Sequence, residues 1–161
     1  MLKLHGKHVA RNIAILVLIG GTVGTMATRA SAAVNADVRA GVIMDQSQVG
    51  VGAGVITPFT NDHRWYFNPN LELSTGSGRS QVAMNGDVHY DISQRENMSV
   101  WMGAGPAVLV RNPEVGDTQT AMGVNLLTGI GGTKGSVRPF GQLKGVVSDN
   151  SEVVLQGGIR F

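Results

Sequence analysis

Three residues with catalytic potential recur at every second position near the middle of the chain: His89, Asp91 and Ser93. A serine nucleophile, a histidine base and an orienting acid together perform acyl transfer or deacylation. Side chains two residues apart on one strand, however, stand about 6–7 Å from each other, too far for direct hydrogen bonds. We therefore expect no catalytic site and no enzyme. A barrel enzyme that modifies lipopolysaccharide is the alternative.

The remaining sequence contains no other pattern typical of a reactive site. His63 falls in a turn-forming stretch, and the two remaining histidines precede residue 33. No metal-ligand spacing, phosphate-binding loop or nucleic-acid motif is present, so we expect no metal, no cofactor and no nucleic-acid partner. The chain also has no cysteine, which excludes a disulfide-stapled domain.

The excess of basic over acidic residues in the chain comes from its first 32 residues. These hold 4 of the 13 basic residues and none of the 11 acidic ones, which leaves 9 basic against 11 acidic side chains afterwards. A positive start, an apolar stretch over 13–26 and small residues over 30–32 predict a cleavable signal peptide. An uncleaved anchor is the alternative, but the apolar run over 13–19 is well short of the roughly 20 residues of a membrane-spanning helix. The predicted domains are therefore a signal peptide over 1–32 and a barrel domain over 33–161.

After residue 33, apolar and polar residues alternate with a period of two, which is typical of strands with two different faces. Eight segments follow this pattern: 34–44, 49–55, 64–73, 81–92, 99–110, 122–130, 137–147 and 153–161. Seven short turn-forming stretches separate them: 46–48, 61–63, 75–78, 94–97, 112–117, 131–136 and 149–151. Short turns pair sequential strands as antiparallel hairpins, so we expect an up-and-down meander.

Three features indicate that the apolar face meets lipid. The polar face carries nine glycines, which suit a crowded interior better than a watery surface: Gly41, Gly50, Gly52, Gly54, Gly103, Gly105, Gly123, Gly129 and Gly158. Lysine occurs after residue 33 only at Lys134 and Lys144, although soluble sheets protect themselves with exposed charge. The strands also match the roughly 9–11 residues needed to cross a bilayer.

An open sheet in lipid would leave edge backbone groups unpaired, so the first and last strands must join. The predicted fold is all-β: an eight-stranded antiparallel up-and-down transmembrane β-barrel after a cleavable signal peptide. Side chains fill the interior at this strand number, which excludes a wide porin-like channel. A soluble exported ligand-binding β-barrel is the alternative architecture.

Nine titratable residues share the polar face: Asp37, Arg39, Glu72, Asp87, His89, Asp91, Arg138, Lys144 and Arg160. Unpaired charges are costly in a low-dielectric interior, so we expect a network of pairs in the lumen. The candidates are Asp37 or Arg39 with Arg160 and its neighbours across the closing seam, and Glu72 with Lys144 across the lumen. Purely structural filling of the interior is the simplest role for this network.

The last predicted strand carries alternating apolar residues at Val153, Leu155 and Ile159 and ends in the aromatic Phe161. With the signal peptide and eight amphipathic strands, this pattern resembles the small bacterial outer-membrane barrels of the OmpA/OmpX kind. The resemblance implies an outer-membrane location in contact with lipid and lipopolysaccharide. It also implies export by the secretion apparatus and insertion by the barrel assembly machinery, which in that family reads a last strand ending in phenylalanine.

The same resemblance implies a structural or limited-permeability role, with a salt-bridge plug that can gate leakage of small solutes. We expect a monomer. The connections are shorter than the long extracellular loops of that family, which disfavours adhesin and receptor roles. With both termini in the periplasm, Phe59, Trp65 and Tyr90 fall near the periplasmic strand ends, as does Phe161. We interpret them as an interfacial aromatic girdle, against the alternative of chance placement.

Overall fold

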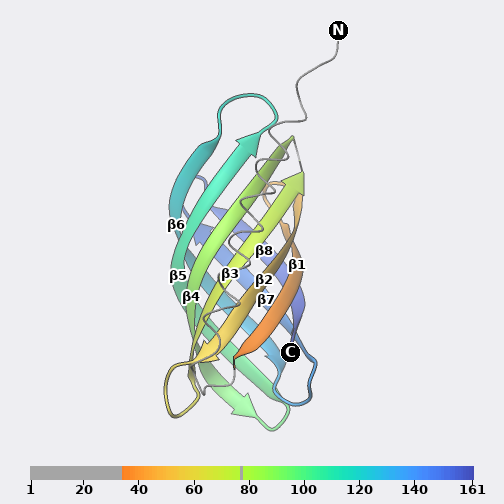
Figure 1. The fold of residues 1–161 in the computed structure, drawn as a ribbon, viewed down its shortest axis with the longest axis vertical. Helices are drawn as coiled ribbons and strands as arrows, with labels where there is room; N and C mark the ends of the chain where they lie inside the picture. The colour runs from red at the N-terminus through yellow and green to blue at the C-terminus, as the bar shows by residue number, and fades with distance from the viewer. Residues whose placement is uncertain (1–33, 77) are drawn as a thin grey trace. The chain divides into compact units, whose positions relative to one another are not determined.

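The computed structural model describes residues 34–76 and 78–161; the predicted signal peptide over 1–32 lies outside this range. The described residues contain eight strands: β1 (Asn35–Ile43), β2 (Gln48–Pro58), β3 (Trp65–Gly76), β4 (Arg79–Arg95), β5 (Met98–Pro113), β6 (Gln119–Gly132), β7 (Arg138–Val147) and β8 (Glu152–Arg160). Each strand pairs antiparallel with the next, and β1 pairs with β8, which closes the barrel (Figure 1). The predicted eight-stranded up-and-down barrel is confirmed. Within the described part of the chain, no helix is long and apolar enough to cross a membrane.

The three middle strands are longer than the alternation predicted. β4 has 17 residues, β5 has 16 and β6 has 14. The turn expected over 94–97 shrinks to Glu96 and Asn97, because the ladder continues to the pair Arg95 and Met98. A polar stretch that is typical of a turn can therefore still be part of a strand, where the backbone pairing continues past the alternating apolar residues.

The meander places its connections at two opposite ends. The chain enters β1 and leaves β8 at the end that also carries the connections 59–64, 96–97 and 133–137; we call this the termini end (Figure 1). The connections 44–47, 114–118 and 148–151 lie at the other end, with the turn between β3 and β4; we call this the far end. Gly78 in that turn has a φ of +71°, in the left-handed region that glycine adopts most readily.

Burial in the barrel is inverted relative to a soluble domain. Among the described residues, seventeen polar or charged side chains are buried against ten hydrophobic ones, while large hydrophobic side chains such as Val51, Leu126 and Leu155 are exposed on the outer face. The two faces follow the strict alternation of each strand, so the polar positions of the sequence pattern point inward. The barrel therefore presents its apolar surface to its surroundings.

Inward-facing glycines make room for large interior neighbours and for close strands. A Cβ atom built on Gly129 would lie 2.4 Å from the indole ring of Trp101, its partner on β5. A Cβ atom on Gly105 would lie 2.3 Å from the carbonyl oxygen of Gly86 on β4. At these two positions, the curvature of the narrow barrel leaves no space for a side chain.

Leu127 interrupts the polar pattern of β6, and the structure explains why. It is buried inside the barrel, where it forms an apolar cluster with Trp101 and Phe140. The Trp101 indole N–H donates to the Gln142 side chain at 3.3 Å, so the polar edge of this buried ring is also satisfied.

Candidate functional site inside the barrel

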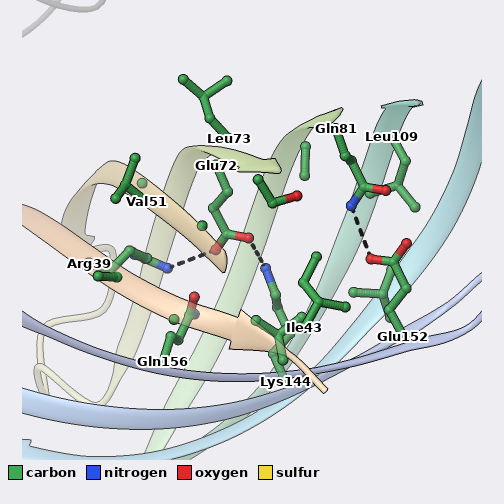
Figure 2. A pocket seen from close by; sticks show the side chains of 18 residues that line it. Arg39, Ile43, Val51, Glu72, Leu73, Gln81, Leu109, Lys144, Glu152 and Gln156 are labelled. Carbon is green, nitrogen blue, oxygen red and sulfur yellow. Dashed lines mark hydrogen bonds and ion pairs between the residues drawn. The ribbon is translucent and has the colours of Figure 1, made fainter. Parts of the chain in front are cut away.

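A cluster of buried charges crosses the interior from β1 to β3 and β7. Arg39 donates to the Asp37 carboxylate on the same strand at 2.5 Å and lies 3.7 Å from the Glu72 carboxylate. Lys144, which is almost fully buried, forms an ion pair with the other oxygen of Glu72 (Figure 2). We call these four residues the central charge cluster. Glu72 is its bridge, because its two carboxylate oxygens face cations from two other strands, Arg39 on β1 and Lys144 on β7.

Side-chain amides extend this cluster and hold its carboxylates. Asn68 donates to Asp37 at 3.1 Å. Asp87 has no ion pair within residues 34–76 and 78–161 but accepts from Asn70 at 3.0 Å and from Asn125 at 2.7 Å. Hydrogen bonds to an ionised carboxylate are among the stronger ones, and a buried carboxylate without them would be costly. The amides are therefore part of the network, although the sequence analysis considered only titratable residues.

A second buried ion pair lies nearer the far end. Arg111 donates to Glu152 at 2.8 Å and to Gln81 at 2.9 Å, and Gln81 donates to the other oxygen of Glu152 at 3.0 Å. This pair was not expected from the sequence because both residues border predicted turns. Arg111 continues the inward phase of Leu109, and Glu152 continues that of Gln156, so extending the period of two would have found them.

An apolar layer separates the two charged levels, which the predicted polar interior did not include. It consists of inward-facing residues from five strands: Ile43, Ala83, Ala107, Leu109, Val146 and Val154. Along β8, for example, Val154 stands between Glu152 and Gln156. A cavity of about 30 Å³ lies beside this layer and the central charge cluster (Figure 2). That volume is on the order of two or three water-probe spheres, which is too small for a continuous column of water at this level.

The predicted pairing of Arg160 with Asp37 or Arg39 does not form. Asp37 and Arg160 are neighbours in the β1–β8 register, but the Asp37 carboxylate is taken by Arg39 and Asn68. The Arg160 guanidinium instead stacks over the rings of Trp101 at 4.3 Å and Phe140 at 4.7 Å. A long arginine two residues along the same strand reaches Asp37 first, which the sequence analysis did not consider.

The other predicted lumen residues lie at the termini end. His89 is buried, with its ring 5.4 Å from Tyr66 and 5.7 Å from Trp101. Asp91 is buried and accepts from Gln94 at 2.9 Å.

Arg138 is half-buried at the same end of the barrel. Its guanidinium donates to Asn35 at 2.5 Å and to the Phe161 backbone oxygen at 3.3 Å.

The row of His89, Asp91 and Ser93 does not assemble into a triad. No hydrogen bond joins any two of these residues in the described part of the chain, and a bulge between Asp91 and Ser93 breaks their common register. Ser93 is exposed while the other two are buried. Across the same residues, no group of three or more acidic, histidine or cysteine side chains could hold a metal ion.

The aromatic residues of the predicted girdle lie together on the outer face near the termini end. The Trp65 ring is 6.4 Å from Phe59 and 4.9 Å from Tyr90. Arg64 donates to the Tyr90 hydroxyl at 2.8 Å. In the adjoining connection, the Thr60 hydroxyl and the Arg64 backbone N–H donate to Asp62 and hold the pKa of that carboxyl below its ordinary value.

The residues predicted for the closing strand all lie on the outer face. Val153, Leu155 and Phe161 are exposed, and Ile159 is half-exposed next to them. The Phe161 backbone N–H donates to Ala36 at 2.9 Å, so the ladder with β1 continues to the last residue.

The fold is similar to those of known outer-membrane barrels. The N-terminal β-barrel domain of Pseudomonas aeruginosa OprF superimposes with a TM-score of 0.68 and 13% identity, covering 80% of this chain and 95% of that one. Neisserial surface protein A gives a TM-score of 0.61 and 16% identity, covering 79% and 94%. A de novo designed transmembrane β-barrel gives 0.54 and 13%, covering 80% and 92%. No protein-family model and no curated protein sequence matches the chain.

Proposed function

We propose that the chain is an integral outer-membrane β-barrel protein with a structural role in the envelope and an interior that is closed to solutes. Its partners are then outer-membrane lipid and lipopolysaccharide, with the secretion apparatus and the barrel assembly machinery acting during its biogenesis. It acts as a monomer and not as an enzyme. The similarity to outer-membrane barrels of two bacterial groups supports this location.

The observation that carries the proposal is the inverted burial of the barrel. Water-facing surfaces of soluble proteins rarely expose continuous apolar patches, whereas the outer face here is apolar on every strand. Lipid solvates such a face, and closure between β1 and β8 leaves no strand edge unpaired. A soluble ligand-binding barrel would need the opposite arrangement.

The closed interior supports a structural role rather than conduction. Ions entering from either end would meet the apolar layer, where neither carbonyl nor charged groups replace their hydration. On one side of this layer the charges of the central charge cluster pair among themselves, and on the other side Arg111 pairs with Glu152. We accordingly expect no steady ion current through the protein in planar bilayers at low voltage.

Fractionation of a Gram-negative host expressing the full chain tests the location. We expect the protein in the outer-membrane fraction, resistant to extraction with carbonate or urea and released by detergent. Unboiled samples should migrate differently from boiled ones in detergent gels, because the closed barrel survives the detergent. Recovery of the folded protein from the periplasm without detergent would exclude the membrane location.

The aromatic cluster of Phe59, Trp65 and Tyr90 provides a test of depth in the membrane. In a Trp101→Phe background, Trp65 is the single remaining tryptophan. We expect stronger quenching of Trp65 by lipids brominated near the headgroup than by lipids brominated near the chain end, because interfacial aromatic rings sit at headgroup level. Stronger quenching from the bilayer centre would contradict a girdle at this position.

A further inference from the structure

The termini end of the barrel holds a cavity of about 280 Å³ that the structural role does not use. Residues from all eight strands and from the 59–64 and 133–137 connections line it. Its charged and titratable lining consists of His63, Tyr66, His89, Asp91, Arg95, Arg138 and Arg160. Three arginines therefore face one carboxylate across this space.

Two of these arginines stand directly opposite each other. Arg138 on β7 and Arg160 on β8 are register partners, and both point into the barrel. Like charges at directly opposed positions of a sheet destabilise it. The Nε atoms of both side chains are buried without a hydrogen-bond partner. The sheet thus brings together two cations that repel each other and retain free donors.

The other interior cations are all neutralised. Arg39, Lys144 and Arg111 each form an ion pair with Glu72, Asp37 or Glu152. No ion pair to Arg138 or Arg160 is present within residues 34–76 and 78–161. The positive charge left over in the interior is concentrated at the wall of this one cavity.

The two carboxylates near this wall already accept hydrogen bonds. Asp91 accepts from Gln94, and Asp37 accepts from Arg39 and Asn68. Arg138 has two partners, the Asn35 side-chain oxygen and the Phe161 backbone oxygen at 3.3 Å. The Arg160 side chain has no hydrogen-bond partner among the described residues. Its donors remain for a group that the chain itself does not supply.

The Arg160 side chain is also held in place. Its guanidinium lies against two buried rings, those of Trp101 and Phe140. A planar guanidinium fixed in this way presents its fork of N–H donors without further ordering, and the fork matches the paired oxygens of a phosphate group. Preorganised donors reduce the entropic cost of binding.

We propose that this cavity is a binding site for a phosphate-type oxyanion, held between Arg138 and Arg160 and screened by them from Asp91. The anion would neutralise the guanidinium groups of these two register partners and complete the pattern of paired interior charges. The phosphate can belong to a free ion or to a lipid headgroup at the membrane surface, since both offer the same oxygens.

The test uses the barrel refolded in a zwitterionic detergent in a Trp65→Phe background, so that Trp101 reports on the stacked Arg160. Titration with inorganic phosphate should change the Trp101 emission saturably. Arg160→Gln and Arg138→Gln should each weaken the apparent affinity about tenfold or more, since each removes charge-assisted hydrogen bonds. Calorimetry on the same samples provides a readout that does not depend on the fluorophore.

Lys134→Gln is the matched control, because it removes a positive charge at the same end of the barrel from a side chain that does not line the cavity. Its affinity should equal that of the parent. Equal weakening in all three variants, or an identical response to chloride, would show unspecific screening and overturn the proposal. Heat-modifiable migration verifies that each variant is folded, and Arg138→Gln keeps the test valid if the change at Arg160 impairs folding.

Vesicles distinguish the two sources of phosphate. In phosphatidylcholine vesicles with added phosphatidylglycerol, a Trp101 change without free phosphate, lost in Arg160→Gln, identifies a lipid headgroup. A change that requires free phosphate identifies the soluble ion. Absence of both responses, together with a null titration in detergent, contradicts the site while leaving the structural role untouched.

Discussion

Replacing Glu72 by glutamine should lower the free energy of unfolding by about 3–5 kcal/mol, because removing one partner of a buried ion pair leaves the other charge uncompensated. Glu72 faces Arg39 on one side and Lys144 on the other, and Lys144 is only 1% exposed. Arg39 retains Asp37, whereas Lys144 retains no carboxylate within ion-pair distance among the described residues. Urea unfolding in lipid vesicles, followed by the fluorescence of the buried Trp101, measures the loss.

The double variant Glu72→Gln/Lys144→Met is the control for this mechanism. Because it removes the orphaned ammonium together with its partner, it should unfold at a higher urea concentration than Glu72→Gln alone. Replacing a buried pair by uncharged groups of similar volume is often close to neutral. Two results would contradict the assigned role of Glu72. One is a double variant whose loss of unfolding free energy equals the sum of the two single losses. The other is a loss below about 1 kcal/mol in Glu72→Gln alone, as is typical of exposed ion pairs.

Replacing Gly105 by valine should either prevent closure of a stable barrel or lower its free energy of unfolding by about 3 kcal/mol or more. A loss of this size lies at the upper end of the effects of overpacking. The first added atom would lie 2.3 Å from the carbonyl oxygen of Gly86 and 2.6 Å from Cα of Asp87. These are backbone atoms, so a rotamer change cannot relieve the clash. Moving β4 would also disturb Asp87, which is held by Asn70 and Asn125.

The same substitution at Gly141 is the matched control. A Cβ atom there would have no heavy atom within 4 Å, and valine favours strands. Gly141→Val should therefore refold with unchanged yield, judged by heat-modifiable migration in detergent gels. Equal failure of both variants would indicate that glycine matters for strand flexibility rather than for the space inside the barrel.

The period of two was sufficient to predict the barrel. The two faces of the sheet meet different surroundings, an apolar one outside and a polar interior, so apolar and polar residues must alternate along each strand. It predicted strand ends less well. The turn expected over 112–117 begins two residues late, since the β5 ladder continues to Pro113 opposite Arg79. How far a strand extends past its alternating apolar residues depends on the strands beside it. The pattern within one strand does not show where its neighbours end.

The interior was predictable only in part, because the expected pair of Glu72 with Lys144 forms whereas the pair of Arg111 with Glu152 was not expected. Glu72 and Lys144 lie on β3 and β7, on opposite sides of the closed sheet. Their side chains meet across the interior although the two residues are far apart in the sequence. Arg160 illustrates the limit, because register alone places it beside Asp37 while a nearer arginine takes the carboxylate. Competition among donors depends on side-chain reach, which residue spacing does not encode.

The pairing of β1 with β8 has a consequence for the order of assembly. It joins partners more than a hundred residues apart, from Asp37 with Arg160 to Ile43 with Val154, whereas the other seven ladders join neighbours in the chain. Local hairpins form early, while long-range closure is slow because the loop entropy must be overcome first. Until the final residues are available, both outer strands expose edges that recruit foreign chains. The lifetime of this open-edged intermediate, rather than the stability of the finished barrel, sets the risk of aggregation.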